Sequence, residues 1–363
     1  MASQNLVFDP EGDVKFTFEE EAVENGDEHR GAGKADEKDS NPRGKRKRSN
    51  STTPEAQMIT MLVSSRHLSL ASNVFKAMLR QNFQEGNELS LNGTVTINLP
   101  EDNPTAFEIL MNIIHAKNRS IPKKVTLQML TELAILVDKY RMHESTGFLA
   151  DMWIAELEDD IPHKMCEDLM LWMAITYVFR HEEHFEDVTA TARYYTVGKR
   201  FRFKQGARFS ESLPIPEKVI GAEQSLFGLF PLNKKLITFA EEIDRLRQHD
   251  ICLALSKIGA LIKRLQSPQP KLCPASIFIC ESSLLGSLLR SALSLKLWPL
   301  PEKPYEQLSF HDVSSSIKKL EILSYCQANH KGQDGHFLMD GIQREVENIR
   351  SRQFGVEIDF TGP

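Results

Sequence analysis

The feature that most constrains the fold is a long segment with almost no side chains that could build a core. Between Glu19 and Gln57 the only branched aliphatic or aromatic residue is Val23, and mostly charged or small polar residues fill the remainder. Such a segment buries too little apolar surface to offset the entropy that it would lose on ordering. We therefore expect residues 19–57 to be disordered, with the folded parts formed by the chain on either side.

Strand patterns flank this segment. Val14, Phe16 and Phe18 alternate with polar residues after a turn at Gly12, which predicts a strand with one buried face. The stretch 58–63 is compatible with a second strand. Because closure entropy grows only slowly with loop length, we predict that the charged segment is an insertion joining two strands of one sheet.

From Leu68 onward the apolar residues recur at three- and four-residue spacing, which predicts helices. Residues 89–91 and 94–99 return to alternation, and Gly93 between them predicts a hairpin turn. Asn103 and Pro104 are typical of a helix start. This mixture of strands and helices predicts an α+β domain.

From residue 158 onward the patterns are almost entirely helical. Residues 236–265 form one long amphipathic stretch that we expect to be a spine for shorter helices. The expected shorter helices are 169–179, 284–297, 313–325 and 338–350, and residues 354–360 predict a strand or a docked tail. The second half is therefore predicted to be a mostly α-helical C-terminal domain.

The charge balance gives no general attraction to nucleic acid or anionic membranes. Lys and Arg total 44 against 50 Asp and Glu, a net charge of −6. The five cysteines form no CxxC pair, which is typical of reduced thiols inside a cell. No secretory signal pattern and no apolar run of the ~18 residues that a membrane helix needs are apparent, so we expect a soluble intracellular protein without a membrane partner.

Several motifs in the N-terminal part share the spacing of one known family. They are Gly12-Asp13-Val14, the run from Val63 to Met78, Phe83-Gln84-Glu85, Leu99 to Asp102 before Phe107, and Leu133 to Tyr140. Together they resemble the BTB/POZ domain, in the form common in filamentous-fungal proteins. The resemblance implies short strands capped by helices over residues 1–145, interrupted by the insertion at about 19–57, with the helical domain at 146–363. Asn73, where the family usually has proline, and the insertion are departures from the pattern.

The resemblance implies a non-enzymatic protein-interaction adaptor that needs no cofactor. Family members commonly form homodimers, and several connect substrates to cullin-type ubiquitin ligases or recruit transcriptional regulators. Asp13 and Val14 match the family's dimer-forming strand, and a dimer would cover this otherwise exposed sheet edge. Phe83 and Glu85 match a pattern in cullin-binding members, although Phe83 could instead pack the helix end against the core.

A basic run lies within the charged segment. Its side chains fit the acidic, aromatic-lined groove of an import receptor, which predicts a nuclear import signal at Arg43, Lys45, Arg46, Lys47 and Arg48. Solvated linker charge and nonspecific phosphate contact stay open as alternatives. We expect the protein in the nucleus, the cytoplasm or both.

Direct DNA contact by a transcription or chromatin factor is the alternative function. The candidate segment is 199–208, where basic and aromatic residues alternate, but an exposed strand or loop explains that pattern as well. Nothing in it predicts reading of base edges, so we do not expect a nucleic-acid partner.

Two groups of residues were considered as metal ligands, and no metal site is predicted from either. Cys273, Cys280, Cys326 and His330 could complete a tetrahedral zinc site, but their spacing is not that of a standard finger and the apolar neighbours favour buried thiols, so zinc binding stays open. His181 and His184 are better interpreted as a solvated helix end. Residues 31–34 lack the context of a phosphate loop and no catalytic motif was found, so we predict that the protein is not an enzyme.

Overall fold

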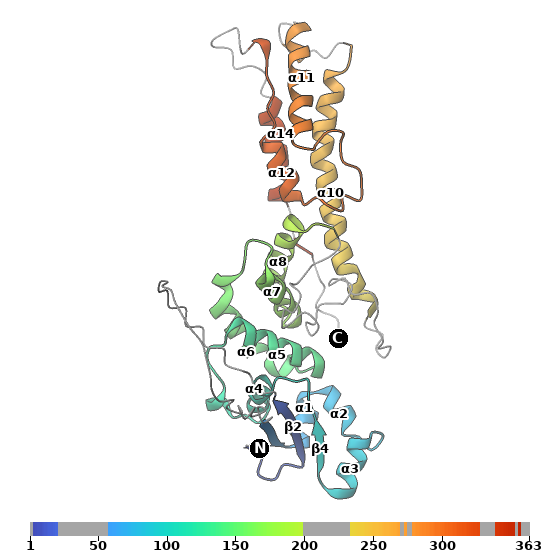
Figure 1. Ribbon diagram of the computed structural model, residues 1–363. Coiled ribbons are helices and arrows are strands. Elements are labelled where there is room, and N and C mark those ends of the chain that lie inside the picture. The colour runs from blue at the N-terminus through green and yellow to red at the C-terminus, as the bar shows by residue number, and fades with distance from the viewer. Residues whose placement is uncertain are drawn as a thin grey trace, which may run out of the picture. The chain divides into compact units, whose positions relative to one another are not determined.

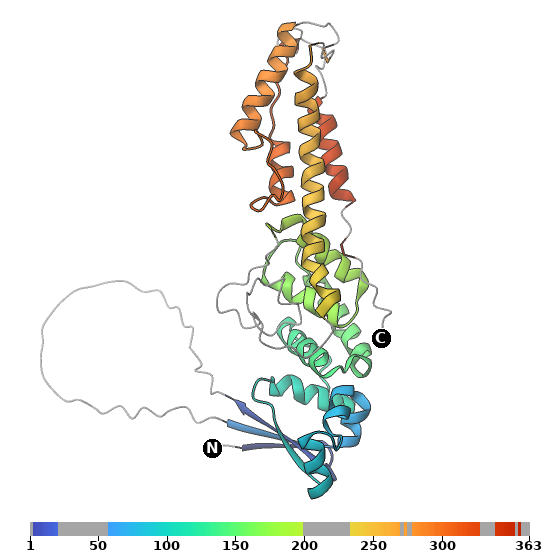
Figure 2. The ribbon, with the colours of Figure 1, turned by 90° about the vertical axis from the view of Figure 1, so that its right-hand side faces the viewer.

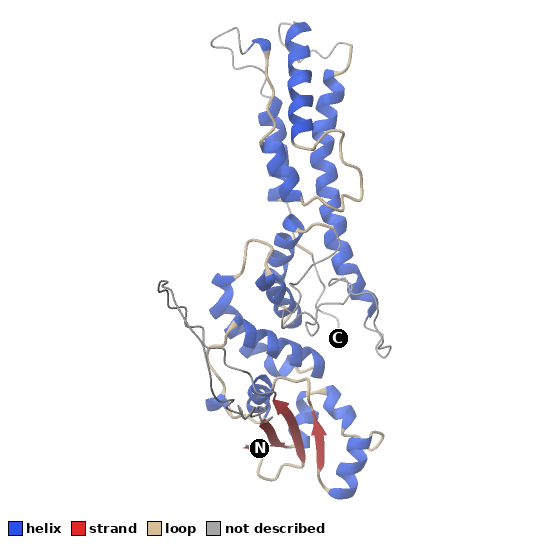
Figure 3. Ribbon diagram, viewed as in Figure 1, coloured by secondary structure: helices blue, strands red, loops and turns tan. Residues whose placement is uncertain are grey.

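The computed structural model describes residues 3–20, 57–198, 233–268, 272–273, 278–326, 338–352 and 355–356. The chain divides into two units, of which unit 1 comprises Met1–Lys123 and Leu136–Thr146, and unit 2 comprises Lys124–Ile135 and Gly147–Pro363. The described strands all belong to unit 1, and the described part of unit 2 is built from helices and loops (Figure 3). The predicted import signal at 43–48, the segment 199–208 and His330 lie outside the described residues.

The sheet of unit 1 has four strands in the order β1-β3-β2-β4. Their bounds are Ser3–Val7 for β1, Val14–Glu20 for β2, Gln57–Val63 for β3 and Val95–Asn98 for β4. β2 and β3 pair antiparallel, whereas β1 with β3 and β2 with β4 pair parallel (Figure 2). The prediction that the insertion joins two strands of one sheet is therefore confirmed.

The paired strands extend slightly into the segment that we expected to be disordered. Glu20 is in register with Gln57, and Glu19 with Met58. Backbone hydrogen bonding in a ladder depends little on side-chain apolarity, so β2 and β3 continue beyond their last apolar residues.

The alternation seen in the sequence produces a sheet with one buried face. Val14, Phe16 and Phe18 of β2 are almost fully buried, as predicted. The Phe107 ring lies 4.9 Å from that of Phe16 and 5.8 Å from that of Tyr140, measured between centroids. This aromatic cluster is the core of unit 1.

Six α-helices lie between Ser65 and Leu157 along the chain. They are α1 (Ser65–Ala71), α2 (Asn73–Met78), α3 (Gln84–Asn92), α4 (Pro104–Ile114), α5 (Leu127–Tyr140) and α6 (His143–Leu157), with short 3-10 turns at Asn118–Ser120 and Glu158–Asp160. Asn103 caps α4 by accepting a hydrogen bond from the Ala106 N–H, and Pro104 occupies the first turn, as predicted.

The predicted strand at 89–91 and its hairpin turn are wrong. These residues form the end of α3, and Gly93 terminates that helix in the left-handed conformation at φ 72°. The Gly93 N–H donates to the Leu89 carbonyl. Glycine adopts positive φ easily, and both a helix end and a hairpin turn need a residue of this kind. The short alternation over 89–91 therefore could not distinguish a helix that ends at Gly93 from a strand followed by a hairpin turn.

Unit 2 contains α7 (Glu167–Val178), α8 (Glu182–Tyr195), α10 (Asn233–Leu265), α11 (Phe278–Ser294), α12 (Phe310–Lys318) and α14 (Leu338–Ser351). α10 contacts α8, α11, α12 and α14, so the predicted spine is confirmed (Figure 1). Within the described residues no helix combines the length and apolarity that crossing a bilayer requires.

Two parts of unit 2 bear on the predictions of a helix at 313–325 and of a strand or docked tail at 354–360. The helix expected at 313–325 ends at Lys318, because the backbone that follows is hydrogen-bonded by serine side chains of α11. Of the expected tail, residues 355–356 are described, and the Val356 N–H donates to Thr189 Oγ1 of α8 at 2.9 Å.

Candidate interaction surface

Asp13 joins the turn before β2 to the start of α1. Its carboxylate accepts hydrogen bonds from the Ser65 N–H at 2.7 Å and from Ser65 Oγ at 2.6 Å. Gly12 makes this close turn possible, because a Cβ there would lie 2.7 Å from the Val63 carbonyl oxygen. The Asp13 side chain is thus engaged inside unit 1 while remaining partly exposed.

Val14 is fully buried, so its side chain belongs to the core of unit 1. β2 is an inner strand, and the strands at the two edges are β1 and β4. The expectation that the strand carrying Val14 is an exposed edge is therefore wrong. The sequence between residues 6 and 18 forms two strands, and the edge is β1, where Val7 is 51% exposed. The assignment of Asp13 and Val14 to a dimer interface stays a prediction.

Phe83 occupies the N-cap position of α3, with Glu85 in the first helical turn. The Phe83 side chain is 51% exposed, so it is not packed into the core as the alternative interpretation expected. Gly86 lets α3 approach the end of α2, since a Cβ at Gly86 would lie 1.9 Å from the Arg80 carbonyl oxygen. The chain therefore presents an aromatic ring and a carboxylate together on a tightly held helix start.

Two further apolar side chains are exposed on neighbouring helices of unit 1. Leu70 of α1 is 88% exposed and Leu91 of α3 is 84% exposed. Sequence reasoning singled out neither residue as exposed: Leu70 lies outside the predicted helical stripe, and Leu91 was expected in a strand at 89–91. Local periodicity does not show which part of a helix stays uncovered in the folded chain.

His115 joins the end of β3 to α4. His115 Nε2 accepts from the Ser64 N–H at 3.1 Å, and its Nδ1 donates to the Met111 carbonyl at 2.9 Å, so the ring is neutral with its proton on Nδ1. The Phe8 ring lies 5.7 Å from the imidazole. Burial lowers the pKa of His115, with a further contribution from the facing His67, whose ring lies 4.7 Å away. Asp9 and Lys117 also face the ring and act in opposite directions.

Unit 1 is expected to lose stability as pH falls below 7. The unfolded state takes up a proton at its ordinary pKa of about 6.5, whereas the folded state resists it, so stability declines with falling pH until the folded pKa is reached. Urea unfolding between pH 7 and 5 measures this. His115→Gln, which still accepts a hydrogen bond but does not titrate, should flatten the profile. His163→Gln, at an exposed position, is the control; equal slopes in all three proteins would contradict the role of His115.

The structure also brings together three of the residues considered as metal ligands. The Sγ atoms of Cys273, Cys280 and Cys326 all lie within 4.8 Å of one another, and all three residues are buried. Among the described residues this is the group with metal-binding geometry. His181 and His184 instead stack their rings at 4.3 Å, and His184 Nε2 lies 3.0 Å from a Glu158 carboxylate oxygen.

The comparisons with known proteins identify one domain type in this chain. A family model described as the BTB/POZ domain matches residues 60–156, from within β3 to near the end of α6. No curated protein and no solved structure matches this chain.

Proposed function

Because this chain carries a BTB/POZ domain, we propose that it is a protein-interaction adaptor that forms a homodimer through β1. The observation that supports β1 is its position at the edge of the sheet, where Val7 is half exposed. An edge strand offers unpaired backbone groups, and pairing with a second chain satisfies them. Asp13 contributes to this interface indirectly, because its hydrogen bonds with Ser65 of α1 fix the turn between β1 and β2.

Light scattering coupled to size exclusion tests the dimer. The full chain is expected to have twice its monomer mass of 41.3 kDa. Val7→Lys places a charge on the edge and should give the monomer. Thr96→Lys, also at an exposed position but on the opposite edge strand β4, should leave the dimer intact. A monomeric wild type, or dissociation by Thr96→Lys alone, would overturn the proposal.

Recruitment of a cullin-type ubiquitin ligase is the second proposed function. It is supported by the exposure of Phe83 and by the place of Glu85 in the first turn of α3. A substrate receptor would bind the ligase through this helix start and its substrate elsewhere. Co-purification with a cullin N-terminal domain is expected for the wild type and should be lost in Phe83→Ala/Glu85→Ala. Leu91→Ala, which removes an exposed leucine from the same helix, should keep it; no binding by the wild type would exclude this function.

Nuclear entry through residues 43–48, with an import receptor as partner, is part of the proposed function. Replacing the basic side chains of this run by alanine should abolish nuclear accumulation, which fluorescence microscopy of the tagged full chain measures. The phosphate-contact and linker alternatives both predict unchanged localisation.

A further inference from the structure

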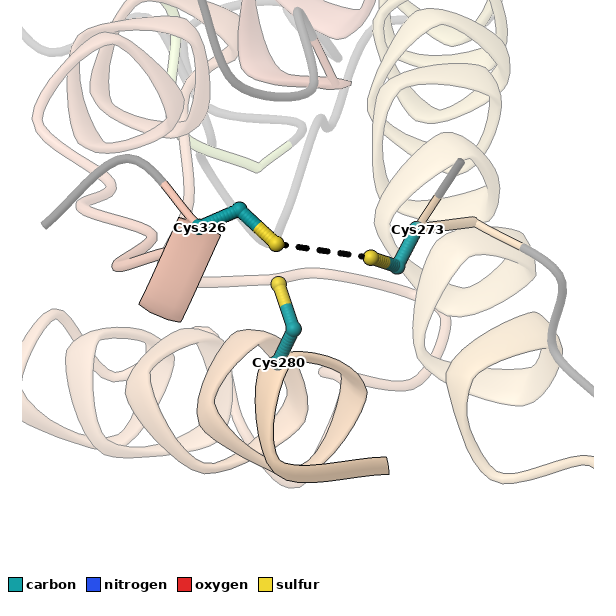
Figure 4. A group of neighbouring side chains, drawn as sticks. All are labelled: Cys273, Cys280 and Cys326. Atoms are coloured by element: carbon teal, nitrogen blue, oxygen red, sulfur yellow. Dashed lines mark hydrogen bonds between the residues drawn. The ribbon is translucent and has the colours of Figure 1, made fainter. Parts of the chain in front are cut away.

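Three thiols from separate parts of the chain meet inside unit 2. Cys273 lies between α10 and α11, Cys280 is in the first turn of α11, and Cys326 follows α12. Their exposed fractions are 2%, 0% and 8%. The sulfur atoms of Cys273 and Cys326 are 3.5 Å apart, and Figure 4 shows all three sulfur atoms turned toward a common point.

A ladder of serines holds the segment that carries Cys326 along α11. Ser283, Ser287 and Ser291 recur every four residues and so share one face of the helix. Ser291 Oγ accepts from the Glu321 N–H at 3.0 Å, and Ser287 Oγ accepts from the Leu323 N–H at 2.9 Å. Ser283 Oγ donates to the Leu323 carbonyl at 3.0 Å. The chain therefore runs along α11 toward its N-terminus, where Cys280 lies.

Two more contacts complete the arrangement around the sulfur atoms. The Leu272 N–H donates to Glu281 Oε1 at 3.3 Å, which ties the residue before Cys273 to the first turn of α11. Ser324 Oγ lies 3.4 Å from Cys280 Sγ, close enough to donate a hydrogen bond to a thiolate. Hydrogen bonds of this kind orient metal ligands.

The distances suit a shared cation better than a disulfide. A tetrahedral zinc ion with Zn–S bonds of about 2.3 Å holds its sulfur ligands about 3.8 Å apart, which lies between the 3.5 Å pair and the 4.8 Å limit. A disulfide needs about 2.05 Å and would use two of the three thiols.

We propose that Cys273, Cys280 and Cys326 bind a zinc ion as three thiolates, with one further ligand completing the tetrahedron. Binding releases three protons to solvent and leaves the three sulfurs and the ion with a net charge of −1. The ion links the α10–α11 connection to the segment after α12, so it stabilises the helical unit independently of the dimer proposed above.

The test is the metal content of tag-free full-length protein, measured by inductively coupled plasma mass spectrometry. One zinc per chain is expected. Cys280→Ala and Cys326→Ala should each lower the content at least tenfold, while Cys166→Ala and Cys252→Ala, at exposed and half-buried thiols, should retain it. No zinc in the wild type, copper in its place, or zinc retained in both cluster variants would overturn the proposal.

A second measurement separates loss of the site from loss of the fold. Wild-type protein freed of metal with a chelator is titrated with Co²⁺, and an intense thiolate-to-cobalt charge-transfer band is expected, together with uptake of one ion per chain. Circular dichroism checks that the chelated protein is still helical. A helical protein that gives no charge-transfer band contradicts the site, whatever happens to the variants.

Discussion

Replacing Arg247 by methionine is expected to lower the stability of unit 2 by about 3–5 kcal/mol, because the change leaves a buried carboxylate without its cation. Arg247 of α10 is 0% exposed. Its Nη2 lies 2.6 Å from Asp244 Oδ1, and the Asp244 side chain is also buried. Methionine keeps the apolar volume but cannot neutralise that charge.

The same guanidinium also satisfies carbonyl groups of a loop distant in the sequence. Arg247 Nη1 donates to the carbonyls of Tyr305 and Leu308, and Nη2 donates to that of Pro304. These carbonyls precede α12, so Arg247 fastens that loop to the spine. Losing these hydrogen bonds leaves acceptors unpaired in a buried place, which adds to the cost.

Thermal unfolding followed by circular dichroism measures the effect, which should lower the melting temperature by roughly 10 °C in a domain of this size. Arg245→Met is the matched control on the same helix. Arg245 is 65% exposed and pairs with Glu242 three residues before it, as Arg247 pairs with Asp244, so only about 0–1 kcal/mol is expected. Equal losses in the two variants would show that burial of Arg247 is not what matters.

Replacing Asp102 by alanine is expected to cost unit 1 about 2–3 kcal/mol. Asp102 follows β4, and its side chain is 4% exposed. It accepts hydrogen bonds from Lys139 Nζ at 2.6 Å and from the Tyr140 hydroxyl. Burial and the nearby Asp102 carboxylate raise the pKa of Tyr140, so the phenol stays protonated and donates.

The contact matters because Tyr140 is at the centre of the core of unit 1. Its ring stacks on that of Phe75 at 4.5 Å, and its carbonyl accepts a hydrogen bond from Ser72 Oγ at 2.5 Å. Ser72 in turn caps α2 through the Phe75 N–H. Asp102 therefore positions a residue on which both α2 and the aromatic cluster depend.

Urea unfolding of Asp102→Ala, Tyr140→Phe and the double variant measures this coupling. Tyr140→Phe alone should cost about 1 kcal/mol, since Lys139 still compensates the carboxylate, and the double variant should cost less than the sum. Asp138→Ala, which breaks a more exposed pair with Arg141, is the control and should cost below about 1 kcal/mol. Additive effects of Asp102→Ala and Tyr140→Phe would contradict the coupling.

Local patterns were enough to predict several parts of this fold. The alternation of Val14, Phe16 and Phe18 predicted a one-sided strand because side chains in a strand point alternately to its two faces. The long amphipathic stretch predicted α10 because its apolar residues recur with the helical period. The motifs quoted for the BTB/POZ domain were likewise local, and the family match over 60–156 confirmed that domain.

Features that depend on pairing between distant segments could not be predicted from local patterns. The pattern of residues 6–18 does not predict that β1 is at the edge of the sheet and β2 inside it, because long-range hydrogen bonding sets the order of the strands. That Phe83 at the start of α3 is half exposed likewise follows from packing in the folded chain and not from the local pattern. The serine side chains of α11 bring the segment that carries Cys326 toward Cys280, and the contact of Leu272 with Glu281 brings Cys273 there.

The order of residues thus set the helices, the strands and the domain type, because each of these follows from side-chain period and local capping over a few turns of chain. Only the tertiary structure decided that Asp102 accepts a hydrogen bond from Tyr140 and that the buried Arg247 binds carbonyl groups of the loop before α12. It also brought the thiols of Cys273, Cys280 and Cys326 together. These contacts join residues far apart in sequence, and their energies come from burial and charge compensation that exist only once the segments have met.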